Sequence, residues 1–169
     1  HLSIRRQRQM CIRDSSKWDS ITFAGGDSGI GLAPLLGVVD GRPALVYTDY
    51  NTGTTVYRRA NNATGGDPLN WPAGFSFDPD TEYSGYDTSF AVVGGYPAIA
   101  YRDRNTEELK YAVSARTDGA VAASWQSVVV ENAGDPGRFC SLADVAGRPA
   151  ISYIEDDSGD LKYAVFTGP

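Results

Sequence analysis

Apolar and polar residues alternate along several short stretches of the chain, most clearly near its middle. Between Pro97 and Asp103, Ile99 and Tyr101 occupy alternate positions, with Ala98 and Ala100 between them. Successive side chains of an extended strand point to opposite sides, so this period of two predicts a β-strand. One face of the strand carries large side chains and the other carries small ones.

The flanking stretches predict three more strands. Residues 88–93 form a short apolar run that ends at two glycines, and 109–113 follow a polar turn. A looser stretch then leads to a fourth apolar run at 125–130. Turns fall roughly every 8 to 12 residues, as in all-β proteins, and no segment has helical periodicity. The pattern therefore predicts a four-stranded antiparallel unit.

This unit recurs along the chain. The stretch Gly95–Tyr101 (GYPAIAY) has copies at Gly41–Tyr47 (GRPALVY) and Gly147–Tyr153 (GRPAISY), at offsets of 54 and 52 residues. Tryptophan recurs in the same way, as Trp18, Trp71 and Trp125. A strand-rich repeat of about 50 residues is typical of β-propeller blades. We expect an all-β fold, a β-propeller segment of about three four-stranded antiparallel blades, with repeats at approximately 18–70, 71–124 and 125–169.

The repeats also predict how the blades pack. The large face of the second strand carries Leu45/Tyr47, Ile99/Tyr101 and Ile151/Tyr153, and the small face carries Ala44/Val46, Ala98/Ala100 and Ala150/Ser152. A large face packed against a small face gives close interdigitation between neighbouring blades.

Three blades are fewer than the four to eight that natural propellers use. By the order of its strands the chain begins with a fourth strand, Trp18–Phe23, and ends on a third strand, Leu161–Val165. Three arrangements remain open. The chain is a segment of a larger propeller, or two copies form a homodimer that completes a six-bladed ring, or an open arc exposes two apolar blade faces.

The repeat resembles that of a known family. Gly-x-Pro-Ala-Ile-x-Tyr at 95–101, an acidic turn, and Leu-Lys-Tyr-Ala at 109–112 and 161–164 are similar to blades of bacterial secreted and surface β-propellers, which are distantly sialidase-like. The resemblance implies an extracellular or cell-surface location. The sialidase-type turn lacks its tryptophan here, so the resemblance does not carry sialidase chemistry over to this chain.

The first fifteen residues differ from the repeats. They contain four arginines, the one histidine of the chain (His1) and Cys11. Met10–Ser15 resembles the translation of a sequencing adaptor, which indicates a metagenomic reading frame whose true N-terminus is missing. The alternative is a basic N-terminal arm. With residues 1–15 read as a non-native segment, His1 and Cys11 carry no chemistry.

The chain is acidic, with 15 Lys and Arg against 21 Asp and Glu, a formal net charge of −6. Residues 1–15 hold four arginines and one aspartate, so without them the net charge is −9. Nucleic-acid binding depends on basic residues that neutralise phosphates, so this balance argues against a nucleic acid as partner. No run of about 18 apolar residues is present, so we expect no membrane insertion.

The candidate ligand site lies on one rim of the predicted blades. Turns between second and third strands share that rim with the loops that lead into the next first strand, and such loops commonly carry function. The candidate ligand-binding residues are Tyr83, Tyr86, Asp87, Asp49, Asp103 and Arg138. Tyr83 and Tyr86 have no counterparts in the other repeats. The structural alternative is that each hairpin aspartate bonds its own backbone.

Support for catalysis is slight. Once His1 is set aside, no histidine remains for a Ser/His/Asp or Cys/His relay, and we expect Cys140 to be a buried apolar residue. We expect no cofactor and no metal site. A pair of carboxylates suffices for glycoside hydrolysis, and no spacing identifies one.

The sequence favours a non-enzymatic binding module of a bacterial secreted or surface protein, with a glycan or a surface protein as partner. One alternative is a structural repeat segment of a larger propeller. The other is a fragment of a glycoside hydrolase or lyase propeller.

Overall fold

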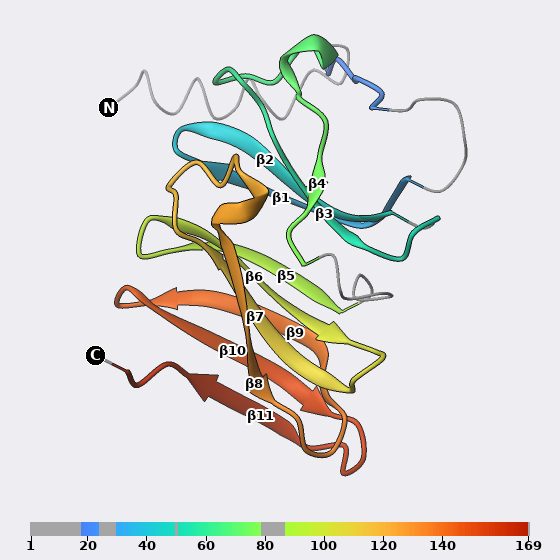
Figure 1. The fold of residues 1–169 in the computed structure, drawn as a ribbon, viewed down its shortest axis with the longest axis vertical. Coiled ribbons are helices and arrows are strands. Elements are labelled where there is room, and N and C mark those ends of the chain that lie inside the picture. The colour runs from blue at the N-terminus through green and yellow to red at the C-terminus, as the bar shows by residue number, and fades with distance from the viewer. Residues whose placement is uncertain (1–17, 24–29, 50, 79–86, 169) are drawn as a thin grey trace, which may run out of the picture.

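The structure is a computed structural model, and it describes residues 18–23, 30–49, 51–78 and 87–168. The described strands form three antiparallel sheets that lie one after another along the long axis of the molecule (Figure 1). We call them blades 1, 2 and 3 in chain order. The segment 1–15, read above as non-native, lies outside the described residues.

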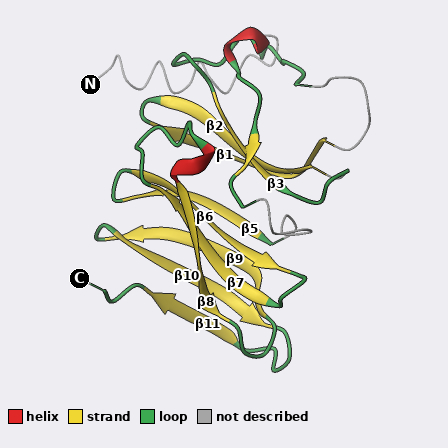
Figure 2. Cartoon of the chain, in the orientation of Figure 1, coloured by secondary structure: helices red, strands yellow, loops and turns green. Residues whose placement is uncertain are grey.

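Blades 1 and 2 each have four strands in sequential order. Blade 1 contains β1 (Ile30–Val39), β2 (Arg42–Asp49), β3 (Thr55–Arg59) and β4 (Phe75–Ser76). Blade 2 contains β5 (Thr88–Val93), β6 (Tyr96–Asp103), β7 (Glu108–Ser114) and β8 (Trp125–Glu131). Blade 3 has three strands, β9 (Pro136–Val145), β10 (Arg148–Glu155) and β11 (Leu161–Val165). Two short helical turns, Pro68–Asn70 and Ala122–Ser124, precede β4 and β8 (Figure 2).

The predicted all-β propeller segment is therefore confirmed, with one difference at the N-terminal end. We expected residues 18–23 to form a fourth strand, and they form none. A strand requires a hydrogen-bonded neighbour, and none of the described strands pairs with this segment. Trp125 begins β8 and Trp71 lies just before β4, so repeats counted from the tryptophans are out of phase with the sheets by one strand.

The blades pack large face against small face, as the alternation predicted. Between blades 1 and 2, Ala44 and Val46 share a buried cluster with Ile99 and Tyr101. Between blades 2 and 3, Ala98 and Ala100 are buried with three residues of β9 and β10, namely Leu142, Ile151 and Tyr153. The large face of each blade therefore always points toward the preceding blade.

The backbone conformation of the hairpin turns explains the repeated glycine before each second strand. The β1–β2 hairpin turns through Asp40 and Gly41, at φ of 47° and 70°, and the β9–β10 hairpin through Ala146 and Gly147, at 55° and 80°. Two-residue hairpins with positive φ at both central positions match the right-handed twist of the strands. Glycine reaches that region without steric cost, which accounts for its recurrence.

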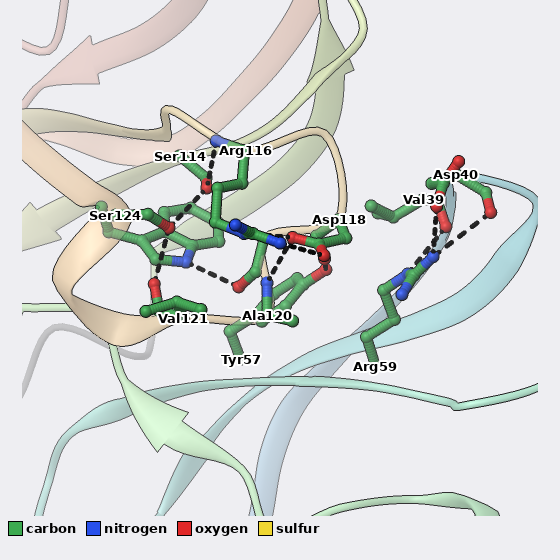
Figure 3. Close-up of polar contacts among 12 residues, drawn as sticks. Val39, Asp40, Tyr57, Arg59, Ser114, Arg116, Asp118, Ala120, Val121 and Ser124 are labelled. Atoms are coloured by element: carbon green, nitrogen blue, oxygen red, sulfur yellow. Dashed lines mark hydrogen bonds and ion pairs between the residues drawn. The ribbon is translucent and has the colours of Figure 1, made fainter.

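A loop before each fourth strand is held by a buried tryptophan. The indole Nε1 of Trp71 donates to the Gly65 carbonyl at 2.8 Å, and that of Trp125 donates to the Gly119 carbonyl at 3.0 Å. Figure 3 shows the second loop, where the Tyr57 hydroxyl of blade 1 also donates to the Asp118 carbonyl at 3.1 Å. The tryptophans thus fix the loops that lead into β4 and β8.

Candidate functional site

A cluster of charged side chains lies at the rim where blades 2 and 3 meet. Arg102, near the end of β6, donates from Nε to Asp135 Oδ1 at 2.8 Å and makes a second contact with Oδ2 of the same carboxylate. Its Nη1 lies 3.8 Å from Asp87 Oδ2. These side chains are largely buried, and such charges are stable only where they are paired. Arg102 therefore joins the two blades.

The backbone around Asp135 is shaped for this contact. Asp135 has a φ of 50° and Gly137 a φ of 107°. A side chain at Gly137 would place Cβ 3.1 Å from Arg102 Cβ and 3.3 Å from Leu109 Cδ1. The glycine thus lets β9 approach β6 closely enough for the Arg102–Asp135 pair to form.

Asp87 connects this pair to the surface. Its carboxylate accepts a hydrogen bond from the Phe139 backbone N–H at 2.9 Å, and Arg104 Nη2 lies 3.7 Å from it. Phe139 has a φ of 51°, and its side chain is exposed. Asp87 therefore stabilises the irregular start of β9 and also holds a guanidinium group at the rim.

Arg138 lies on the blade 3 side of the same rim. Its Nη1 donates to Asp156 Oδ1 at 2.6 Å, and its guanidinium lies 5.3 Å from the centre of the Phe139 ring. Asp156 raises the pKa of Arg138 above its ordinary value, through the hydrogen bond first and through charge second. The side chains of Arg104 and Arg138 are 43% and 41% exposed, so both cations face solvent. We call Arg104, Arg138, Asp87, Arg102, Asp135 and Asp156 the arginine rim.

The recurring hairpin carboxylates are engaged in their own hairpins. Asp103, which is buried, binds Lys110 Nζ at 2.7 Å and accepts from the Asn105 N–H at 3.0 Å. At the same repeat position, Glu155 binds Lys162 Nζ at 2.6 Å. Burial alone would raise the pKa of Asp103, but the Lys110 ammonium and the Asn105 N–H bring it below its ordinary value. These bonds match the structural alternative for the hairpin positions.

The predicted site residues are only partly brought together. Asp87 and Arg138 belong to the arginine rim. Asp49, in blade 1, accepts from the Asn51 N–H at 2.9 Å within its own hairpin, and Asp103 binds Lys110. Tyr83 and Tyr86 lie outside the described residues.

Sequence reasoning missed Arg102, Arg104 and Asp135. A signal for Arg102 was present, since the corresponding positions are Thr48 in blade 1 and Ile154 in blade 3. A charge at an otherwise uncharged repeat position marks a place where one blade interface differs from the others.

A second polar cluster lies around the loop in Figure 3. Arg116 makes two hydrogen bonds to Asp118, each of 3.0 Å, and Arg59 contacts Asp40 at 2.8 Å. The Arg116 guanidinium lowers the pKa of Asp118 to about 2, although its partial burial acts in the opposite direction. Both pairs hold loops or turns of their own blade, so this cluster has a structural role.

The part of the chain that the structure describes offers neither a metal cluster nor a membrane-spanning helix. No group of three or more His, Cys, Asp or Glu residues there could hold a metal ion. No helix within the described ranges has the length and apolar character needed to cross a membrane.

Comparison with known proteins bears on the fold. No protein family matches the chain, and no curated protein matches it. A solved structure described as a bifunctional GH43-CE of Bacteroides eggerthii superposes with a TM-score of 0.50 over 83% of this chain. GH43 is a β-propeller family. The fold is that of a β-propeller segment. At 11% identity the likeness concerns the fold alone, and the chain spans 20% of the length of that enzyme.

Proposed function

We propose that the chain is a non-enzymatic binding module that takes an acidic saccharide at the arginine rim. The supporting observation is that two solvent-facing guanidinium groups from different blades, Arg104 of β6–β7 and Arg138 of β9, are held near one buried carboxylate, Asp87. The proposed setting is a bacterial secreted or surface protein, which rests on the resemblance of the repeats.

The chemistry of the two arginines suits a carboxylate or sulfate on a sugar. A guanidinium has five N–H donors in a planar fork, so an arginine such as Arg138 can donate hydrogen bonds to a second anion while it binds one carboxylate. Arg138 contacts Asp156 through Nη1, and the Phe139 ring limits the directions that its guanidinium can take. Preorganised donors lose less conformational entropy on binding than mobile ones.

The carboxyl groups favour binding over hydrolysis. A glycoside hydrolase needs a general acid whose pKa is raised so that it stays protonated near neutral pH. The pKa values of four described carboxyl groups are lowered instead, so these four do not suit that role: Asp103, Asp118, Asp144 and Glu155.

Calorimetry and an array of neutral, carboxylated and sulfated oligosaccharides test the proposal. We expect the chain to bind acidic members, and Arg104→Gln and Arg138→Gln each to weaken binding about tenfold, the loss of one charge-assisted hydrogen bond. Arg148→Gln is the matched control, because this exposed arginine begins β10 at the opposite end of blade 3. Equal binding by all three variants, or no binding to any saccharide, would refute the proposal and leave a structural repeat segment.

A further inference from the structure

The first residue of a fourth strand fills a defined space on the preceding blade. Trp125 begins β8 of blade 2, and its ring lies 5.0 Å from the ring of Tyr57 in β3 of blade 1. Phe77, just after β4, lies 5.4 Å from the same indole. The side chain of Trp125 is buried by these contacts. One tryptophan therefore fills the space between blades 1 and 2 next to β3 and β8.

The corresponding space between blades 2 and 3 is open. Tyr111 of β7 occupies the repeat position of Tyr57, and beside it lies an apolar groove of about 710 Å³. Residues of both blades line the groove, among them Tyr111, Val113, Val128, Ile151, Val165 and Phe166. Blade 3 has three strands, so β11 is an edge strand of its sheet within the described residues. A fourth strand on β11 would begin at this groove.

The chain carries one more tryptophan of the repeat. Trp18 aligns with Trp71 and Trp125, and its side chain is 80% exposed. Five residues later, Phe23 lies 5.0 Å from Trp71, as Phe77 lies 5.4 Å from Trp125. Residues 18–23 thus stand beside blade 1 where the fourth strand of a preceding blade would stand.

The exposed outer faces of blades 1 and 3 complement each other as the buried faces between blades do, because one is the large face and the other the small face. Leu36 on the large face of blade 1 is 73% exposed, whereas Leu142 at the same repeat position is buried against blade 2. Leu161 on the small face of blade 3 is 76% exposed, whereas its counterpart Leu109 is buried against blade 3. Each exposed face therefore carries the same kind of side chain as the equivalent face that is buried between two blades.

We propose that two copies of the chain associate head to tail, where the head is residues 18–23 with the exposed face of blade 1 and the tail is β11 with the exposed face of blade 3. Residues 18–23 of one copy add antiparallel to β11 of the other, and Trp18 enters the groove beside Tyr111. The β7–β8 pairing of Tyr111 with Val128 predicts the register, which places Ile21 opposite Tyr163 and Asp19 opposite Val165. Strand addition satisfies the edge N–H and C=O groups of β11 and covers both apolar end faces.

A second copy is the occupant that the geometry fits. Residues 18–23 of the same chain lie against blade 1, at the opposite end of the stack from β11 (Figure 1). In a head-to-tail pair these residues keep their contact with Trp71 and need no rearrangement. When a twofold axis relates the two copies, each supplies one head and one tail, and the closed pair has six four-stranded blades, within the range of known propellers. This inference is independent of the proposed saccharide site.

Light scattering after size exclusion, on the full chain, tests the association. We expect a mass of twice 18.1 kDa, and a mass of 18.1 kDa for Trp18→Ala and for Leu161→Lys. Tyr96→Ala is the control, because it removes an exposed aromatic ring from the middle blade and should leave the dimer unchanged. A parent chain of 18.1 kDa at the highest soluble concentration, or species larger than a dimer, would overturn the proposal.

Mixing the two variants separates head from tail. Trp18→Ala keeps an intact tail and Leu161→Lys keeps an intact head, so the mixture regains one intact interface and should form a dimer that neither variant forms alone. Hydrogen exchange checks strand addition directly. The β11 amides should exchange more slowly in the parent than in Trp18→Ala, while the β6 amides stay equally protected and show that both chains are folded. Equal exchange of β11 in the two chains would overturn the assignment of residues 18–23 as its partner.

Discussion

The hydroxyl of Tyr153 in blade 3 donates a 2.8 Å hydrogen bond to the carboxylate of Glu131 at the end of β8 in blade 2. One repeat earlier, Tyr101 of blade 2 makes the same kind of bond to Asp78, which follows β4 of blade 1. Burial is the main cause that raises the pKa of both tyrosines, and the hydrogen-bonded carboxylate acts in the same direction. A tyrosine–carboxylate bond therefore joins each pair of neighbouring blades.

Tyr153→Phe should lower the free energy of unfolding by about 1 kcal/mol, since the ring stays packed while the bond to Glu131 is lost. Urea unfolding followed by circular dichroism measures the change. Tyr163→Phe, on the exposed face of β11, should have little effect at concentrations where the chain is a monomer. A loss as large at Tyr163 as at Tyr153 would show that the inter-blade bond adds nothing to stability.

Gly119→Ala should destabilise the chain by more than ~1 kcal/mol, because its φ of 60° disfavours a side chain and its Cβ would lie 2.8 Å from Pro97 Cγ and 3.0 Å from the Tyr57 oxygen. Gly159→Ala has a similar φ of 74° with no atom within 4 Å, so it measures the backbone cost alone. The difference between the two midpoints of thermal unfolding reports the packing of this loop against Pro97 of blade 2 and Tyr57 of blade 1. Equal midpoints would contradict the close approach.

Acid should destabilise the loop of Asp118. Its pKa in the folded chain is about 2, below the ordinary 3.8, so its contribution is fully present above pH 3.8 and is lost as the pH falls toward 2. Asp118→Asn should flatten the pH dependence of stability in this window. Arg116→Gln should also weaken this pH dependence, because without the main cause of the low pKa the folded and unfolded pKa values of Asp118 lie closer together. Unfolding curves that keep the parent slope in both variants would exclude this ion pair as the source.

Cys140 should resist alkylation in the folded chain. Burial raises the pKa of its thiol to about 12, and the thiolate is the reactive form. Mass spectrometry of the Cys140 peptide after treatment with iodoacetamide should show almost no modification at neutral pH and full modification in urea. Rapid modification without denaturant would mean that blades 2 and 3 separate readily.

Much of the fold could be predicted because each blade repeats one pattern. The alternation at 97–103 identified both faces of β6, and the three copies identified which faces meet. The prediction of a strand at residues 18–23 was wrong for the single chain, because a strand depends on a hydrogen-bonded neighbour that the local pattern does not reveal. The expectation of a buried Cys140 is confirmed.

The sequence predicted fewer of the contacts in the arginine rim. The pair of Arg102 and Asp135 joins residues 33 positions apart on two blades, and only the close approach at Gly137 brings them within reach. Asp87 and Arg138 were named as candidates from their rim loops, without their partners. Local propensity predicts a loop, whereas contacts across a blade interface depend on how the sheets are stacked.

The uniform direction of the blade interfaces has a consequence for how such a chain can lengthen. The middle blade presents a large face to one neighbour and a small face to the other, and both are covered. A tandem duplication of residues 71–124, one full repeat from β4 to β7, would therefore add one blade whose two surfaces already match those on either side of it. Genetic amplification of a single segment could change the number of units without any new interface having to evolve.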